Sequence, residues 1–183
     1  MRKSLTALAL CLLAARAAGT DPAPAGGEFT ATATVESKQG TRSMAFSVSV
    51  SNPRSPEQVL PLQKVLEEGG QQALLNVIRG GSGGQLKLGA LAYPVDLSIA
   101  EPVKGGERYL LVLTRPLRIE EVNEGQPSLD FPFTVIAFEV PEFGRGEGKI
   151  AVRAALSVEA DGHVRVDTYD APIGKLKDVH RTK

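Results

Sequence analysis

The sequence contains one cysteine and no tryptophan, and each shortage excludes a class of protein. The cysteine, Cys11, lies in an N-terminal segment that we interpret below as removed on export. The remaining chain has no thiol, so it forms no disulfide and no cysteine-ligated metal site, and core packing must stabilise it. With no tryptophan and only three tyrosines, the chain also has few rings that can stack on a sugar.

The chain also lacks an excess of positive charge. Lysine and arginine together number 21, as do aspartate and glutamate, so the formal net charge is 0. This balance gives no electrostatic attraction for nucleic acid or for anionic lipid, and we expect neither as a partner. The two histidines and the acidic residues show neither zinc-ligand spacing nor a calcium-loop pattern, so we assign no metal and no cofactor.

A secretory signal is present at the N-terminus. Arg2 and Lys3 precede an apolar run of about 11 residues, which is shorter than the roughly 20 that span a bilayer. Residues 15–17, Ala-Arg-Ala, then supply the small-x-small pattern of a signal peptidase site. We therefore expect residues 1–17 to be a signal peptide and the mature protein to be exported, with no membrane contact after cleavage.

Export places the mature protein in the periplasm or outside the cell, and the short Ala/Leu-rich signal without disulfides favours a bacterial source. Cleavage after Ala17 removes three basic residues and no acidic one, which lowers the net charge to −3. The alternative is a membrane-anchored lipoprotein acylated at Cys11. We disfavour it because Leu10 stands where such sites have Gly, Ala or Ser.

Alternation with a period of two predicts strands directly after a short linker. Residues 18–27 are small and rich in Pro and Gly, which is typical of a flexible linker. In 29–35 and 44–50, apolar residues alternate with residues that are mostly threonine or serine, and a turn at 39–42 separates the two runs. These runs predict a hairpin with one apolar face and one hydroxyl-covered face. We assign residues 28–181 to a single β-rich domain.

A helical insertion follows the hairpin. A capping-box pattern at Ser55 and Gln58 and a break at Gly69-Gly70 predict two short helices, over 57–68 and 71–79. We expect these helices to cover an edge or an open end of a sheet, because an uncovered sheet edge invites aggregation.

The remainder of the chain is typical of short strands joined by turns. The strands are predicted at 85–91, 93–101, 107–114, 116–122, 132–140, 149–160, 163–169 and 173–179. The fold class is therefore all-β and mainly antiparallel, a sandwich or flattened barrel with the two-helix insertion at about 57–79. Leu110 to Leu113 show no alternation, so we expect both faces of that strand to be covered.

Residues 80–84, Gly-Gly-Ser-Gly-Gly, match the G-x-S-x-G pattern of the nucleophile elbow in α/β-hydrolases. That site needs a strand entering the serine and a helix leaving it. Here a predicted helix precedes Ser82 and a predicted strand follows it. We therefore interpret 80–84 as a flexible connector between the helices and the next strand, and not as a catalytic loop.

The segment 144–149, Gly-Arg-Gly-Glu-Gly-Lys, resembles a phosphate-binding loop only in composition. It lacks the G-x-x-x-x-G-K spacing, and it lies between two predicted strands with no helix N-terminus to bind an anion. We interpret it as a long, mobile hairpin loop. Loops on rigid β scaffolds often carry binding contacts, so its charged residues Arg145, Glu147 and Lys149 are our first binding candidates.

Arg115 is a further binding candidate. It precedes Pro116, which lacks the N–H that a strand ladder needs and therefore suggests a bulge or bend. A bulge would aim Arg115 into the mouth of a cavity. The interpretation that we favour is an ion pair with Asp130 or Glu120.

Two weaker patterns complete the list of candidates. The histidines His163 and His180 have four carboxylates near them in the sequence, Asp161, Asp167, Asp170 and Asp178. A shared metal site there is the less favoured interpretation, and solvated surface histidines are the favoured one. The densest acidic stretch holds Glu120, Glu121, Glu124 and Asp130. A pair of these would suit a glycosidase, but a polar loop explains them as well, so we assign no catalytic residue.

Phe131-Pro132-Phe133-Thr134-Val135-Ile136, followed by Gly144 to Lys149, resembles a pattern in a family of small exported bacterial β-rich proteins of uncharacterised function. The Thr114-Arg115-Pro116 turn and the closing segment from Tyr169 to Val179 fit the same family. The resemblance covers about residues 85–181. It implies an exported β-rich domain, and it implies no activity, cofactor or site residue.

These observations favour an exported, non-enzymatic binding or interaction module of unknown ligand, because no catalytic pattern has the context that its chemistry needs. The alternative is a carrier of a small apolar ligand inside a β-barrel, which the apolar strand 109–113 and a helical lid would suit. A hydrolase whose catalytic site is assembled from residues of distant strands is the least favoured hypothesis. An apolar cavity of about a few hundred Å³ in a closed barrel would favour the carrier, and a filled core the module.

Overall fold

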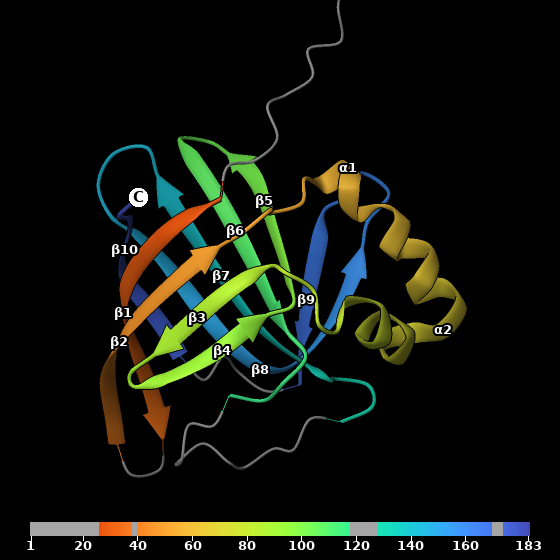
Figure 1. Ribbon diagram of the computed structural model, residues 1–183, viewed down its shortest axis with the longest axis horizontal. Helices are drawn as coiled ribbons and strands as arrows, with labels where there is room; N and C mark the ends of the chain where they lie inside the picture. The colour runs from red at the N-terminus through yellow and green to blue at the C-terminus, as the bar shows by residue number, and fades with distance from the viewer. Residues whose placement is uncertain (1–25, 38–39, 118–127, 170–173) are drawn as a thin grey trace, which may run out of the picture.

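A computed structural model describes residues 26–37, 40–117, 128–169 and 174–183. The signal peptide expected at 1–17 lies outside these residues. The described chain folds into one antiparallel sheet of ten strands with two helices beside it (Figure 1). The strands are β1 (Gly27–Ser37), β2 (Gly40–Val50), β3 (Gly84–Leu88), β4 (Leu91–Val95), β5 (Leu97–Val103), β6 (Gly106–Leu113), β7 (Phe133–Pro141), β8 (Gly146–Val158), β9 (Val164–Thr168) and β10 (Gly174–Arg181).

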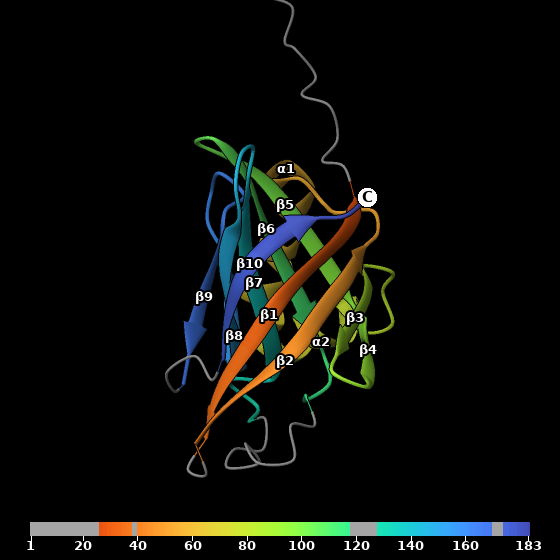
Figure 2. The same cartoon turned by 90° about the vertical axis from the view of Figure 1, so that its left-hand side faces the viewer.

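The strand order is β4-β3-β2-β1-β10-β8-β7-β6-β5, with β9 paired to β8. The sheet curves until its two ends approach each other, which gives a nearly closed barrel (Figures 1 and 2). β4 runs almost directly into β5 through Asp96, whose backbone N–H donates to Val112 O at 3.0 Å. On the other side of β5, the segment after β2 forms a parallel bridge between Arg54 and Ile99. The predicted all-β antiparallel fold is confirmed, in its barrel-like form.

The predicted N-terminal hairpin is confirmed residue by residue. β1 and β2 pair from Gly27 opposite Val50 to Ser37 opposite Gly40. Their apolar side chains, such as Phe29, point into the barrel, while the threonines and serines face outward. The alternation arises because successive side chains of a strand point to opposite faces of the sheet.

Two apolar clusters lie on opposite faces of the sheet. One fills the barrel interior, and the other lies outside, between the sheet and the helices. Strand β6 supplies both of them, with Tyr109, Leu111 and Leu113 in the interior cluster and Leu110 and Val112 in the outer one. The prediction that both faces of this strand are covered is therefore confirmed. The apolar run lacks alternation because neither face meets water.

The helical insertion consists of α1 (Pro56–Val59) and α2 (Pro61–Ile78). The predicted capping contact is present, since Gln58 Oε1 accepts a hydrogen bond from the Ser55 backbone N–H at 3.0 Å. The predicted break is also present as a kink inside α2, where Gly70 has φ 63°. Glycine tolerates this left-handed conformation because it has no Cβ.

The helices pack on the outer face of the sheet and do not cover an open end of the barrel (Figure 1). The apolar side chains of α2, such as Leu74 and Leu75, join the outer cluster that β5 to β8 supply from beneath. This corrects part of the prediction, because a β-barrel with an apolar outer patch must bury that patch too. No helix among the described residues is long and apolar enough to cross a membrane.

The strand predicted at 116–122 is not formed at 116–117, the part of it that lies within the described residues. Thr114 to Leu117 leave the ladder after β6 and form a bend. The rest of the predicted strand at 116–122 lies outside the described residues. Pro116 contributes to this ending, because it offers no N–H to a neighbouring strand.

Candidate binding site at the barrel rim

The segment predicted as a long mobile loop is shorter and more tightly held than expected. Strand β7 ends at Pro141 and β8 begins at Gly146, so the loop comprises only 142–145. Of the three candidates, Arg145 lies in the loop, whereas Glu147 and Lys149 point outward from strand β8. The prediction was wrong here because glycine is common both in loops and where strands approach closely. A Cβ on Gly146 would lie 1.7 Å from Glu139 O, so glycine is needed here for the backbones of β7 and β8 to approach each other closely.

Two contacts hold the 142–145 loop in place. The backbone N–H of Glu142 donates to Gly105 O at 2.8 Å, which joins the loop to the β5–β6 turn. Arg145 Nη1 lies 3.2 Å from Asp178 Oδ1 on β10. The loop and the β5–β6 turn thus form one end of the barrel, which we call the rim (top of Figure 1).

The rim presents a large apolar side chain to solvent. Phe143 is 84 % exposed, more than any other large apolar side chain of the described residues. Phe143 was not among the binding candidates predicted from the sequence. A phenylalanine between Glu142 and Gly144 in a predicted loop was the available signal, because an aromatic residue in such a place has no core to enter.

Two open hollows lie beside the rim loop, and we call them the rim hollows. One has a volume of about 270 Å³ and lies between the β5–β6 turn and the β7–β8 loop. The other, of about 250 Å³, lies on the outer face of β6, β7 and β8. Both are lined by Glu139 and Glu147, so they adjoin. The first is also lined by Lys104 and Arg145, and the second by Arg108 and Lys149. The structure therefore brings Arg145, Glu147 and Lys149 to one site.

A chain of ion pairs borders the rim hollows. Arg108 on β6 donates to Glu139 on β7 at 2.7 Å and to Glu101 on β5 at 3.0 Å. The hydrogen bond to Glu139 raises the pKa of Arg108 above its ordinary value, more than partial burial lowers it. Glu101 also contacts His163, whose Nδ1 lies 2.5 Å from Glu101 Oε2. That contact raises the pKa of His163.

The two strand-borne candidates have no charged partner of their own. Neither Glu147 nor Lys149 forms an ion pair with another described residue, and both are exposed. Lys149 lies directly opposite Lys175 in the pairing of β8 with β10. Like charges in directly opposite positions destabilise a sheet. The charges of Glu147 and Lys149 are exposed on the outer face, where an approaching partner can meet them.

Arg115 does not belong to this site. It follows the end of β6, whereas the start of the same strand, Gly106, lines a rim hollow. Arg115 is exposed and forms no ion pair with Asp130, although the structure describes both. The other predicted partner, Glu120, lies outside the described residues. Because β6 spans the barrel, the two ends of this strand serve different surfaces.

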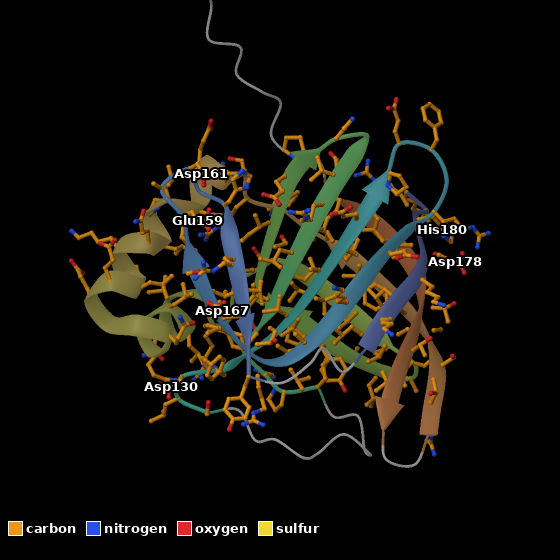
Figure 3. All side chains as sticks on the ribbon, turned by 180° about the vertical axis from the view of Figure 1, so that it is seen from behind. Asp130, Glu159, Asp161, Asp167, Asp178 and His180 are labelled. Atoms are coloured by element: carbon orange, nitrogen blue, oxygen red, sulfur yellow. The ribbon has the colours of Figure 1, made fainter. Side chains whose placement is uncertain are left out.

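The two histidines are far apart. Figure 3 shows Asp161, which neighbours His163, and His180 on opposite sides of the molecule. The described residues contain no group of three or more His, Cys, Asp or Glu that could hold a metal ion. A metal site shared by His163 and His180, which was the less favoured interpretation, is therefore wrong. In the acidic stretch, Asp130 is exposed, and the three glutamates lie outside the described residues: Glu120, Glu121 and Glu124. Asp170, one of the carboxylates near the histidines in the sequence, also lies outside them.

One hydroxyl lies within hydrogen-bond distance of a histidine. Thr30 Oγ1 is 3.1 Å from His180 Nε2, and His180 Nδ1 is 2.8 Å from Asp178 O. This order resembles a nucleophile with its base. Thr30 lies within β1, between its paired neighbours His180 and Ser47, on the outer face of the sheet. Paired strands offer no convergent N–H groups to stabilise an oxyanion, so the geometry does not support acyl transfer.

The glycine-rich segment 80–84 is packed and not a loose connector. A Cβ on Gly81 would lie 2.1 Å from Asp96 O, and one on Gly83 would lie 2.8 Å from the Leu97 carbonyl carbon. The predicted order of elements is confirmed, because α2 precedes the serine and β3 follows it. Ser82 itself is exposed. The segment therefore has no strand entering the serine and no helix leaving it, as an elbow requires.

Comparison with known proteins adds no relative: no family model, no curated protein and no solved structure matches this chain.

Proposed function

We propose that this protein is an exported, non-enzymatic binding module that engages a protein partner through the rim. The observation that carries the proposal is Phe143, which the loop holds 84 % exposed between two fixed attachments. Export rests on the signal peptide expected at 1–17. The partner class is a protein with an apolar pocket for the phenylalanine and charged groups around it.

An exposed aromatic side chain on a loop that is held at both ends is suited to anchoring a partner. Aromatic residues are enriched at protein interfaces, and a few buried anchors contribute most of the binding energy. Burying a phenylalanine side chain stabilises a complex by about 1.5–3 kcal/mol. The hydrogen bond from Glu142 to Gly105 and the Arg145–Asp178 ion pair already order the loop, so little entropy is lost on binding.

The charges near Phe143 provide the polar surroundings of such an anchor. Lys104 and Arg145 border one rim hollow, and Glu147 and Lys149 border the other. Charges at the border of an interface set the association rate and exclude wrong partners. Both signs occur, so the complementary partner surface is also of mixed charge.

The barrel interior supports a module in preference to an apolar-ligand carrier. The rings of Phe29 and Tyr109 lie 4.8 Å apart, and each lies 5.3 Å from the ring of Phe138. Arg181 closes over this cluster, donating at 2.6 Å to both Glu107 and the Tyr109 hydroxyl. Burial raises the pKa of Tyr109 to about 12. These side chains occupy the space that a ligand would need at this end of the barrel.

Photo-crosslinking in the cell envelope tests the proposal. A photoreactive phenylalanine analogue replaces Phe143 in one variant and Leu91 in a control, since Leu91 is also exposed, in the β3–β4 hairpin. We expect one discrete crosslinked protein from position 143, absent from position 91 and absent when Arg145→Glu and Lys149→Glu are added. With that protein purified, Phe143→Ser should weaken binding about thirtyfold and Leu91→Ser should not.

Two outcomes would overturn the proposal. The first is the same crosslinking pattern from both positions, or none from position 143. The second is a partner whose affinity does not depend on Phe143. Loss of folding does not explain either result, because both side chains are exposed and surface substitutions change stability by about 0.5 kcal/mol or less.

A further inference from the structure

A third hollow lies where the barrel closes, and it shares no lining residue with the rim hollows. Three segments form its walls: the chain after β2, the glycine-rich segment after α2, and the junction of β4 with β5. It has a volume of about 270 Å³, and we call it the seam hollow. Its lining includes Asn52, Arg54, Val77, Ser82, Asp96 and Leu97.

The walls of the seam hollow are fixed by hydrogen bonds and close contacts. Ser51 N donates to Gly83 O at 2.9 Å, and Ser98 Oγ donates to Ser51 O at 3.0 Å. Arg54 N donates to Ser98 O at 2.9 Å. Asn52 has φ 45°, a left-handed conformation that asparagine adopts more readily than most residues other than glycine. These contacts fix the shape of the hollow, as is typical of a preformed site.

Opposite charges line the seam hollow without meeting. Arg54 is exposed, and Asp96 is only 6 % exposed, yet no ion pair joins them. Asp96 Oδ2 accepts two hydrogen bonds from Thr114, and Oδ1 accepts one from the Gly80 backbone N–H at 2.8 Å. A carboxylate oxygen has two acceptor positions, so Oδ1 keeps one of them.

We infer that the seam hollow binds a small zwitterion, a free α-amino acid with a short aliphatic side chain. A simple anion would be attracted by Arg54 but repelled by Asp96, and a simple cation would experience the reverse. A zwitterion is the class for which both charges are favourable. Its carboxylate pairs with the Arg54 guanidinium, which suits bidentate recognition, and its ammonium faces Asp96.

Size and polarity agree with this class of ligand. The volume of about 270 Å³ is slightly below the range of pockets that hold drug-sized ligands, so it suits a small ligand. Val77, which is 59 % exposed, and the buried Leu97 provide apolar wall for an aliphatic side chain. The Asn52 amide and the Ser82 hydroxyl add neutral hydrogen-bonding groups at the opening.

NMR titration of the ¹⁵N-labelled protein tests the inference with three probes of similar shape. L-valine carries both charges, isovalerate lacks the ammonium, and isobutylamine lacks the carboxylate. We expect saturable shift changes with L-valine at Asn52, Ser82 and Gly83, and binding at least about tenfold weaker for each single-charge probe.

Two arginine variants make the test specific. Arg54→Gln should weaken L-valine binding at least about tenfold, because its side chain is the cation of the site. Arg79→Gln is the control, because it removes the same positive charge from a residue that does not line the hollow. Arg79 lies at the C-cap of α2. No saturable shift with L-valine, equal binding of isovalerate, or equal weakening by both variants would overturn the inference. Phe143→Ser should leave this binding unchanged, so the rim proposal and the seam proposal fail independently.

Discussion

The side-chain amide of Gln71 pairs with the backbone of Leu156 as a neighbouring strand would. Gln71 Nε2 donates to Leu156 O at 2.8 Å, and Leu156 N donates to Gln71 Oε1 at 3.0 Å. Strand β7 begins at Phe133, which lies opposite Ala154, so the last residues of β8 extend beyond it. Helix α2 thereby satisfies two strand groups that β7 does not reach. A buried backbone group without a partner would cost about as much as a lost hydrogen bond.

Replacing Gln71 should therefore destabilise the protein. We expect Gln71→Ala to lower the free energy of unfolding by about 1–3 kcal/mol, because Leu156 N and O would lose their partner in a partly buried place. Urea denaturation followed by circular dichroism measures the change. Gln63→Ala is the control, since the Gln63 side chain donates to Glu67 on the helix surface. Equal effects of the two substitutions would show that the Leu156 groups find water instead.

The glycine-rich segment should be intolerant at one position and tolerant at the next. Gly81→Ala places a Cβ 2.1 Å from Asp96 O, so we expect a loss of more than about 2 kcal/mol of stability. Ser82→Ala should change stability by less than about 0.5 kcal/mol, because the side chain is exposed. Thermal unfolding of both variants decides the matter. If Gly81→Ala left the stability unchanged, the segment would be a flexible connector and not a packed one.

The His163–Glu101 contact should make stability depend on pH. Glu101 raises the pKa of His163 above 6.5, its ordinary value, so protonation is favoured in the folded state. The contribution is therefore fully present below about pH 6.5 and is lost as the pH rises through the folded-state pKa. We expect it to be below about 1 kcal/mol, because His163 is exposed.

Unfolding measured between pH 5.5 and pH 8.5 shows this effect as a decline in stability towards high pH. His163→Gln should remove that part of the decline, whereas His180→Gln should not. A pH profile that His163→Gln leaves unchanged would show that another group produces it. Titration of the His163 ring by NMR gives the direction of its pKa independently.

Charged side chains at the rim should matter little to folding, and the glycine beside them should matter a great deal. Arg145→Ala combined with Lys149→Ala should change stability by less than about 1 kcal/mol, because both side chains are exposed. Gly146→Ala should cost more than about 2 kcal/mol, because the added Cβ would lie 1.7 Å from Glu139 O. Chemical denaturation compares the two. A large loss in the double variant would mean that the loop is packed through its side chains.

Local patterns in the sequence were sufficient for much of the fold. The threonine and serine alternation of 29–35 and 44–50 predicts the β1–β2 hairpin, because the period of two is a property of a strand alone. The missing alternation at Leu110 to Leu113 predicts a strand whose two faces are both covered by apolar side chains. The break in α2 at Gly70 is likewise local, since only glycine readily takes its left-handed conformation.

Glycine is where local reasoning was least reliable. The residue type is the same in a mobile loop and at a point where two backbones approach each other closely. Gly81 and Gly146 are of the second kind, because the backbone oxygens of Asp96 and Glu139 lie close to them. Both oxygens belong to other segments of the chain. The sequence therefore indicated the charged residues near Gly146 but misjudged the length of the loop that carries them.

The sequence by itself determined the β1–β2 hairpin, the strand with two covered faces and the break in α2, and it placed Arg145, Glu147 and Lys149 near one another. Each of these depends on residues a few positions apart. Tertiary structure alone decided that the sheet closes at Asp96 and Arg54, that His163 meets Glu101 across 62 positions, and that Arg115 lies away from Lys149. Such contacts depend on the order and register of the strands. Order and register result from many weak conformational and packing preferences along the whole chain. No short segment contains that information.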